Sequence, residues 1–238
     1  MNTQFQKIKK LLHGDLDVYE NFDHTQYENT LSPGSMPANE LLQHVVQEIK
    51  PSIIIEVGSF LGWSAWGMSN RMRELNPDGV TICVDTWMGG ADHWEEATFN
   101  SESRIKRKNG YPTFYYNFLA NMCYVGLQET VIPFAYPSVT GASILRRVFK
   151  EQNLRADMIY IDGGHEYWDV ILDLTNYWPL LKESGVMFGD DWTCEDVRKA
   201  VLDFTYEHNL NITVHTNGVH WFITEKKYEN QFHYTVKK

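Results

Sequence analysis

The 238-residue sequence has only three cysteines, Cys83, Cys123 and Cys194, which are far apart and form no CxxC pair. An odd and scattered set excludes a disulfide framework, so we expect the cysteines to act as small apolar fillers. Long apolar runs are also lacking. The N-terminal MNTQFQKIKKLL has no signal-peptide pattern, and no segment approaches the roughly 20 apolar residues of a membrane span. These absences predict a cytoplasmic protein outside the membrane.

Basic residues are outnumbered, since 21 Lys and Arg against 31 Asp and Glu give a net charge of −10. An acidic chain repels phosphate backbones and anionic lipid headgroups. Nucleic acid and membrane surfaces are therefore excluded as expected partners. The basic run Arg104–Lys108 is short, and we interpret it as a solvated loop or helix face.

Apolar, β-branched runs alternate with amphipathic segments through most of the chain. The run SIIIEVG (52–58) is typical of a strand buried on both faces, as in a parallel sheet. Helical spacing precedes it at 41–49 and follows it at 62–75. The same alternation predicts further strands at 80–85, 130–136, 157–162 and 185–190, and helices at 113–126, 142–152, 167–182 and 195–208.

The last two expected strands, 211–216 and 219–225, are joined by Asn217-Gly218, a hairpin signal. The whole pattern predicts an α/β fold: a Rossmann-like, doubly wound, mostly parallel seven-stranded sheet with an antiparallel strand from this C-terminal hairpin. Residues 1–36 show little periodicity apart from a short helical stretch at 7–12. We expect them to form an N-terminal extension or lid on a domain of residues 37–238.

Glycines follow the first strand at Gly58 and Gly62, beside Glu56. Glycines at a strand end let the backbone approach a ligand closely. A dinucleotide fingerprint would need glycines where Phe60 and Trp63 stand, and a P-loop lysine is absent. The loop therefore favours a ligand without phosphates, with a purely structural turn as the alternative.

Asp85 ends the second strand, where a carboxylate can accept hydrogen bonds from both hydroxyls of a ribose. The alternative is an aspartate that caps a helix or turn. Glu56 at the neighbouring strand end strengthens the ligand-binding interpretation, because both acids would flank the glycine loop.

Three more carboxylates follow the fourth and fifth strands: Asp162, Asp190 and Asp191. If these strands are neighbours, about 4.8 Å apart, the carboxylates converge and repel one another. A divalent cation would relieve the repulsion, and all-oxygen ligands favour Mg²⁺, with Mn²⁺ or Ca²⁺ as alternatives. Helix caps and turns are the structural alternative. His165 lies beside this cluster and can accept a proton from a hydroxyl near neutral pH.

Four segments in this order, IIEVGSFLGWSAWGMS, VDTW, IYIDGGHEYWDVILDL and GVMFGDDW, resemble class I S-adenosylmethionine (SAM)-dependent methyltransferases. The resemblance is to the type called methyltransferase domain 24, which includes metal-dependent sugar O-methyltransferases of macrolide and aminocoumarin biosynthesis. It spans roughly residues 34–224. It implies a SAM-dependent O-methyltransferase that acts on a hydroxyl of a sugar or other small diol.

The resemblance also implies site residues. The SAM-binding set would be Glu56, Gly58, Ser59, Gly62, Asp85, Ser138 and Asp162, with Asp85 on the ribose and Ser138 on the adenine side. The metal ligands would be Asp162, Asp190 and Asp191, with Mg²⁺ the expected ion. The catalytic residues would be His165, as base, and Asp162.

The long loop 86–110 departs from the expected pattern and places the acceptor in doubt. Its Trp87, His93 and Trp94 are candidates for a lid or an acceptor wall, with ordinary loop packing as the alternative. Two other functions stay open: a nicotinamide-dependent sugar oxidoreductase, and a SAM-binding protein without activity. Assembly into a homo-oligomer also stays open.

Overall fold

The computed structural model describes residues 3–31, 40–90, 93–94 and 106–225. A seven-stranded sheet runs through its centre in the order β5-β2-β1-β6-β7-β9-β8. The strands are β1 (Ile53–Val57), β2 (Val80–Asp85), β5 (Val131–Ala135), β6 (Ala156–Ile161), β7 (Leu181–Gly189), β8 (Asn211–Val214) and β9 (Trp221–Thr224).

The central strands are parallel, and the last hairpin is antiparallel to them. β1 pairs in parallel with β2 and β6, and β5 and β7 extend the sheet in parallel on either side. β9 then pairs antiparallel with β7, and β8 antiparallel with β9. Each residue of β1 is buried, as expected of a strand covered on both faces. The predicted Rossmann-like, doubly wound fold is confirmed.

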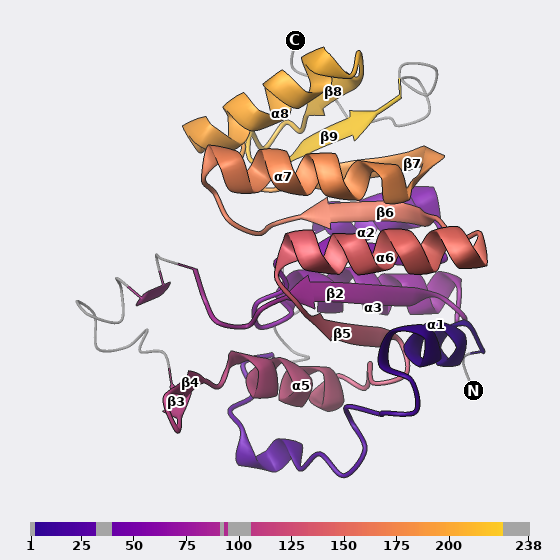
Figure 1. Cartoon of the computed structure of the whole chain (residues 1–238), viewed down its shortest axis with the longest axis vertical. Coiled ribbons are helices and arrows are strands. Elements are labelled where there is room, and N and C mark those ends of the chain that lie inside the picture. Colours follow the sequence, from indigo (N-terminus) through magenta and orange to yellow (C-terminus); the bar gives the residue numbers. More distant parts are fainter. Residues whose placement is uncertain (1–2, 32–39, 91–92, 95–105, 226–238) are drawn as a thin grey trace.

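Helices cover both faces of the sheet in three layers (Figure 1). One face carries α1 (Thr3–His13), α6 (Ser138–Gln152), α7 (Tyr167–Tyr177) and α8 (Glu195–Glu207), which pack with the sheet into one buried cluster. The other face carries α2 (Glu40–Ile49) and α3 (Trp63–Leu75) around a second cluster. Helix α5 (Phe114–Tyr124) lies beyond β5 and packs with α3.

The N-terminal segment packs into the same core as the sheet. Phe5 and Ile8 of α1 are 2% and 1% exposed and belong to the cluster around α6 and α7. His13 Nε2 lies 2.8 Å from the carbonyl oxygen of Pro133, and the Tyr19 hydroxyl donates to Val131 O. Both contacts join the segment to β5, the edge strand. The division into a lid and a domain stays a prediction.

Several element boundaries differ from the predicted ones, most clearly in three places. The helix expected at 167–182 ends at Tyr177, because Pro179 lacks the N–H that a continuing helix needs; a 3₁₀ turn (Trp178–Leu180) follows and β7 begins at Leu181. Helix α6 begins at Ser138, directly after Pro137, rather than at residue 142. The expected loop 86–110 contributes to a short hairpin of β3 (Arg107–Lys108) and β4 (Tyr111–Pro112).

None of the described helices is long and apolar enough to cross a membrane.

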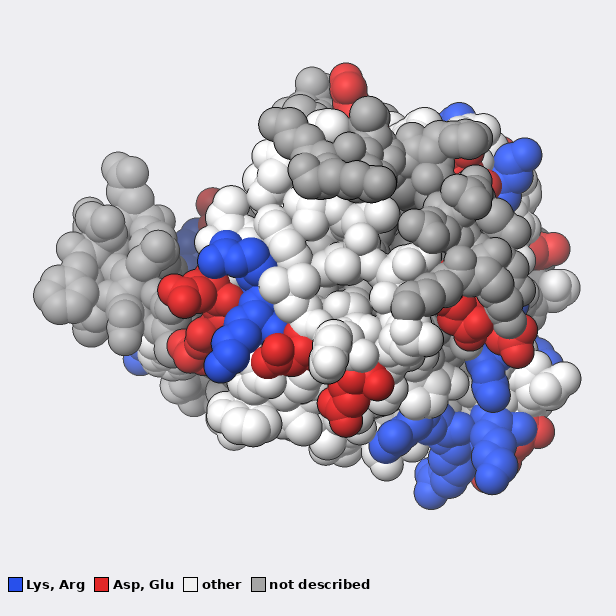
Figure 2. Space-filling view, turned by 90° about the horizontal axis from the view of Figure 1, so that it is seen from above, with Lys and Arg blue, Asp and Glu red and all other residues white. Residues whose placement is uncertain are grey.

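Charged side chains are spread over the surface. In the view of Figure 2, basic and acidic side chains lie in small neighbouring groups around a broad uncharged area. Of the predicted basic run, Lys106, Arg107 and Lys108 are exposed, and Arg107 lies 4.2 Å over the Trp94 ring. Residues 104 and 105 lie outside the described residues.

Candidate active site

The ends of three parallel strands are joined by backbone hydrogen bonds that continue past the strands themselves. Gly58 N donates to Val84 O at 2.9 Å, and Asp162 N donates to Val57 O at 2.8 Å. The ends of β2, β1 and β6 are thereby held side by side, as expected for the ligand-binding edge of a doubly wound sheet.

Gly58 permits the closest approach at this edge. Its φ is +85°, and a Cβ at this position would lie 2.0 Å from the carbonyl oxygen of Asp162. A side chain is therefore excluded both by backbone conformation and by space. Gly62, at φ +86°, precedes α3 and would meet the end of the Met122 side chain at 2.7 Å. The glycine spacing noted in the sequence thus serves contact between strand ends and entry into α3.

Glu56 is completely buried just below this edge. Its carboxylate accepts from the Ser64 hydroxyl at 2.5 Å and from the Cys83 thiol at 3.3 Å. Burial is the main reason that the pKa of Glu56 is raised, and Asp85 raises it further. Ser59, the residue after Gly58, is 2% exposed. The donors to Glu56 are a hydroxyl and a thiol, which carry no charge. The buried carboxylate can therefore interact strongly with a cationic or hydroxyl-bearing ligand.

Asp85 occupies the end of β2, where the sequence placed it. One carboxylate oxygen accepts from Phe60 N at 2.8 Å and the other from Trp87 N at 2.7 Å. Asp85 therefore fixes the glycine loop and the start of the following loop. Since each carboxylate oxygen can accept more than one hydrogen bond, this role leaves lone pairs for ribose hydroxyls. Ribose binding by Asp85 stays a prediction.

Three non-glycine residues at the strand ends have a left-handed backbone. Their φ angles are +42° at Phe60, +52° at Trp87 and +59° at Asp191. Such conformations are uncommon for bulky residues and tend to gather at functional sites. They turn the chain sharply after β1, β2 and β7, which aims the following side chains at one edge of the sheet.

The suggestion that Trp87 lines an acceptor wall is wrong. Trp87 is 2% exposed and packs against Tyr115 and Phe118, while its Nε1 donates to Phe60 O at 2.7 Å. Its left-handed backbone turns the indole into the core instead of toward the loop surface. His93 lies over Phe60, with 4.5 Å between ring centroids, and so remains next to the glycine loop.

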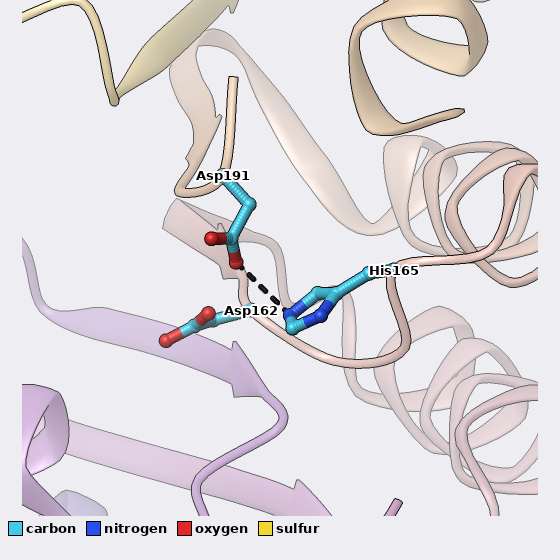
Figure 3. A group of neighbouring side chains, drawn as sticks. All are labelled: Asp162, His165 and Asp191. Carbon is cyan, nitrogen blue, oxygen red and sulfur yellow. Dashed lines mark ion pairs between the residues drawn. The ribbon is translucent and has the colours of Figure 1, made fainter. Parts of the chain in front are cut away.

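Asp162, His165 and Asp191 form a compact group beyond β6 and β7 (Figure 3). One ligand atom from each lies within 4.8 Å of the others. His165 Nε2 lies 3.0 Å from Asp191 Oδ2, and both side chains are partly exposed. Burial is the largest influence on the pKa of Asp162 but not on that of Asp191, and His165 is exposed. Asp162 is therefore the inner carboxylate of the group.

The inner carboxylate is electrostatically strained. Burial, followed by the negative charges of Asp190, Glu56 and Asp191, raises the pKa of Asp162 to about 8. In contrast, the hydrogen bond to His165 lowers the pKa of Asp191. Asp162 thus resists ionisation near neutral pH, and a positive charge placed beside it would be strongly stabilised.

Asp190 lies outside this compact group, which differs from the expected triad of Asp162, Asp190 and Asp191. Its Oδ1 accepts from Asp191 N at 2.8 Å, and its Oδ2 lies 3.8 Å from His220 Nε2. The ligand atoms that the structure gathers come from Asp162, Asp191 and His165, the predicted base. Asp190 faces His220, because the pairing of Gly189 with Trp221 places the next residues, after β7 and before β9, opposite each other.

Ser138 lies at the start of α6, after β5, as expected. Its hydroxyl donates to Asp173 on α7, and its carbonyl oxygen accepts from the Tyr177 hydroxyl at 2.9 Å. Burial raises the pKa of Asp173 to about 7. The Ser138 side chain is thus directed toward α7, and an adenine contact from this residue stays a prediction.

Sequence reasoning missed Asp173 and His220. Asp173 follows helical spacing from Val170 and Tyr177, so it reads as one more position of an amphipathic helix. His220 is separated from Asp190 by 29 residues and is opposed to it only through the antiparallel pairing of Gly189 with Trp221. That pairing was the signal available for His220, because Asn217-Gly218 already predicted the hairpin.

Several solved structures share this fold. The O-methyltransferase TomG from Streptomyces achromogenes, in complex with SAM, has a TM-score of 0.56 at 14% identity and covers 94% of this chain and 91% of its own. An O-methyltransferase from Bacillus cereus in complex with S-adenosylhomocysteine has a TM-score of 0.53 at 15% identity, with 92% and 96% covered. CalS11, a TDP-rhamnose 3'-O-methyltransferase of calicheamicin biosynthesis, has 0.56 at 15%, with 93% and 92% covered.

One curated relative is more similar in sequence. The protein y4gI of Sinorhizobium fredii, which is uncharacterised, is 24% identical over 186 residues. The match covers 71% of this chain and 18% of that protein, so the chain spans about a fifth of its relative's length.

The family comparison agrees with the strand ends described above. A family model described as a methyltransferase domain matches residues 55–192, from β1 through the acidic residues after β7. It thus includes Glu56, Gly58, Asp85, Asp162 and Asp191. The predicted family is confirmed, and the chain belongs to this family of methyltransferases.

Proposed function

We propose that this chain is a SAM-dependent O-methyltransferase that methylates a hydroxyl of a small acceptor with adjacent oxygens, a sugar or another diol, with help from a divalent cation. The observation that carries the proposal is the convergence of Asp162, His165 and Asp191 beside the loop that Gly58 begins. Two carboxylates and an imidazole at the ligand-binding edge of a methyltransferase sheet can bind a cation and accept a proton.

SAM fits this edge of the sheet for chemical reasons. Its sulfonium and ammonium groups are cationic, and the edge of the sheet presents the buried Glu56 and Asp162. Its ribose can be held by Asp85, whose carboxylate is oriented by two backbone amides. The solved structures of TomG with SAM and of the Bacillus cereus enzyme with S-adenosylhomocysteine support the same cofactor.

The donor set also fits a divalent cation. Asp162 and Asp191 offer hard oxygen ligands, and burial together with the negative charges of Asp190, Glu56 and Asp191 raises the pKa of Asp162. Asp190 adds a third carboxylate beside them. When bound, Mg²⁺ would lower the pKa of a chelated acceptor hydroxyl and orient it.

The chain's own residues then perform the proton transfer. His165 Nε2 accepts the hydroxyl proton once the hydroxyl replaces Asp191 Oδ2 as its partner and the neutral ring carries its own proton on Nδ1. The oxygen attacks the SAM methyl carbon, the carbon–sulfur bond breaks, and sulfur keeps the electron pair. The products are a methyl ether, S-adenosylhomocysteine and a protonated His165, whose charge Asp191 stabilises.

The group contains two kinds of side chain, the His165 imidazole and the carboxylates of Asp162 and Asp191, and both bear on the class of acceptor. One acceptor oxygen would face His165 and a second would lie near Asp162 and Asp191, whose ligand atoms are all within 4.8 Å of one another. So compact a group suits two adjacent oxygens, as in a vicinal diol. That CalS11 acts on a rhamnose supports a sugar among such diols. The partner would therefore be a small molecule.

The test measures release of S-adenosylhomocysteine with a panel of acceptors. Each diol is assayed in parallel with the analogue that lacks one of its hydroxyls. We expect turnover with at least one diol, and a loss of about 100-fold or more with its deoxy analogue or in excess EDTA. Full activity in EDTA would refute the cation. SAM binding without product across the whole panel would favour a SAM-binding protein without activity.

A further inference from the structure

The terminal hairpin packs against Asp190. Trp221 Nε1 donates to Asp190 O at 2.8 Å, and Trp192 N donates to Val219 O at 2.8 Å. Because Gly189 pairs with Trp221, the next residues in each direction, Asp190 and His220, face each other. The segment after β7 is thus held in place by residues of β9 and its preceding turn.

The hydrogen bonds of Asn217 determine the tautomer of His220. Asn217 Oδ1 accepts from Val219 N at 3.0 Å and from His220 N at 3.3 Å, so the amide nitrogen must be the atom facing the ring. That nitrogen lies 2.9 Å from His220 Nδ1. Since an amide nitrogen only donates, Nδ1 is the acceptor, and the ring proton of neutral His220 lies on Nε2.

His220 Nε2 is a buried donor without a hydrogen-bond partner. Its side chain is 9% exposed and lies 3.8 Å from Asp190 Oδ2, slightly beyond hydrogen-bond distance. A buried N–H without an acceptor carries a desolvation cost. A small movement of the Asp190 carboxylate toward the ring would remove this cost.

We propose that Asn217 and His220 form a positioning pair that orients the Asp190 carboxylate for the cation site. The inference rests on the proposed function. With Oδ2 held by His220 Nε2, the other oxygen, Oδ1, which accepts from Asp191 N, keeps a lone pair for the site beside Asp162 and Asp191. Carboxylate ligands of metals are commonly fixed by such a second hydrogen bond, and removing it typically weakens metal binding 10- to 100-fold.

The experiment measures binding of Mn²⁺ alone to the full chain by electron paramagnetic resonance, without acceptor. We expect His220→Phe, which keeps a ring but loses the donor, to weaken Mn²⁺ binding by about 10- to 100-fold. His220→Gln, which retains a donor, should stay within a few-fold of the unmodified chain. Thr216→Ala, an exposed change in the same turn, is the matched control and should have no effect.

Further measurements separate the possible failures. SAM binding should be unchanged in the hairpin variants. It serves as the control for folding, because a misfolded hairpin would lower the affinities for both SAM and Mn²⁺. Asn217→Ala leaves His220 in place but frees its tautomer, and a several-fold loss of Mn²⁺ affinity is expected even if His220→Phe does not fold. Equal Mn²⁺ binding by His220→Phe and the unmodified chain would overturn the positioning pair alone. Mn²⁺ binding that is absent in the unmodified chain, or that survives in Asp191→Asn, would overturn the cation site and the pair together.

Discussion

His165 Nε2 and Asp191 Oδ2 lie 3.0 Å apart and join the segment after β6 to the segment after β7. The pair connects the proposed base to a proposed cation ligand through one hydrogen bond. Asp191 also adopts a φ of +59°, which turns its carboxylate toward the imidazole. The contribution of each member of the pair can be measured by replacing it separately.

Replacing His165 by alanine removes the proton acceptor but leaves the carboxylates. We expect kcat to fall by about 100- to 10,000-fold while the Kd for SAM changes little, because general-base catalysis contributes this much. His24→Ala, at an exposed histidine in the 3₁₀ turn His24–Gln26, is the control. Isothermal titration with SAM and a turnover assay check both quantities. Undiminished turnover in His165→Ala would show that another group takes the proton.

Asp191→Asn removes one charge at a position where asparagine tolerates the left-handed backbone. The fold should therefore be preserved, while turnover falls by about 100-fold or more and added Mg²⁺ no longer raises the activity. Glu195→Gln, an exposed acid at the start of α8, serves as the charge-matched control. If Asp191→Asn responded to Mg²⁺ like the unmodified chain, Asp191 would not be a ligand.

Asp162 gives a signature in the pH dependence of stability. Its pKa is about 8 in the folded chain, against an ordinary value of 3.8. Below pH 4 the carboxyl is protonated in both states and contributes nothing. Above pH 4 the unfolded chain loses this proton first, so folding becomes less favourable until about pH 8, by up to about 1.4 kcal/mol for each pKa unit of difference.

Asp162→Asn removes this cost. The variant should therefore become more stable than the unmodified chain as pH rises from 4 to 8, with a constant difference above that range. Urea unfolding in EDTA at several pH values measures the difference. Asp78→Asn, at an exposed turn, is the control for the loss of one carboxylate elsewhere. A difference for Asp162→Asn that does not change with pH would mean that the folded chain ionises Asp162 normally.

Gly58→Ala tests the contact between the ends of β1 and β6. The new Cβ would lie 2.0 Å from Asp162 O, whereas at Gly126 it would meet nothing within 4 Å. Both positions have positive φ, so both variants should bear about 1–2 kcal/mol of backbone strain. We expect Gly58→Ala to lose several kcal/mol more than Gly126→Ala in urea unfolding, and to bind SAM weakly. Similar losses would show that the strand ends separate easily.

The sequence by itself determined the architecture and most of the candidate site. Buried parallel strands are apolar throughout, so the polar residues that end them, Glu56, Asp85, Asp162 and Asp190, were visible as breaks in the pattern. The carboxyl ends of such strands meet at one edge of the sheet, so these residues could be grouped without a structure. The family resemblance depended on the same segments.

Only the tertiary structure decided how the side chains at this edge are directed. Asp190 Oδ2 lies 3.8 Å from His220 Nε2 of the terminal hairpin, and His165 joins Asp162 and Asp191. Trp87 is turned into the core by its backbone angle, which its residue type does not predict. A pattern of residue types predicts where a strand lies in the sequence and where it ends. The direction of the last side chain depends on φ and on contacts with residues distant in the sequence.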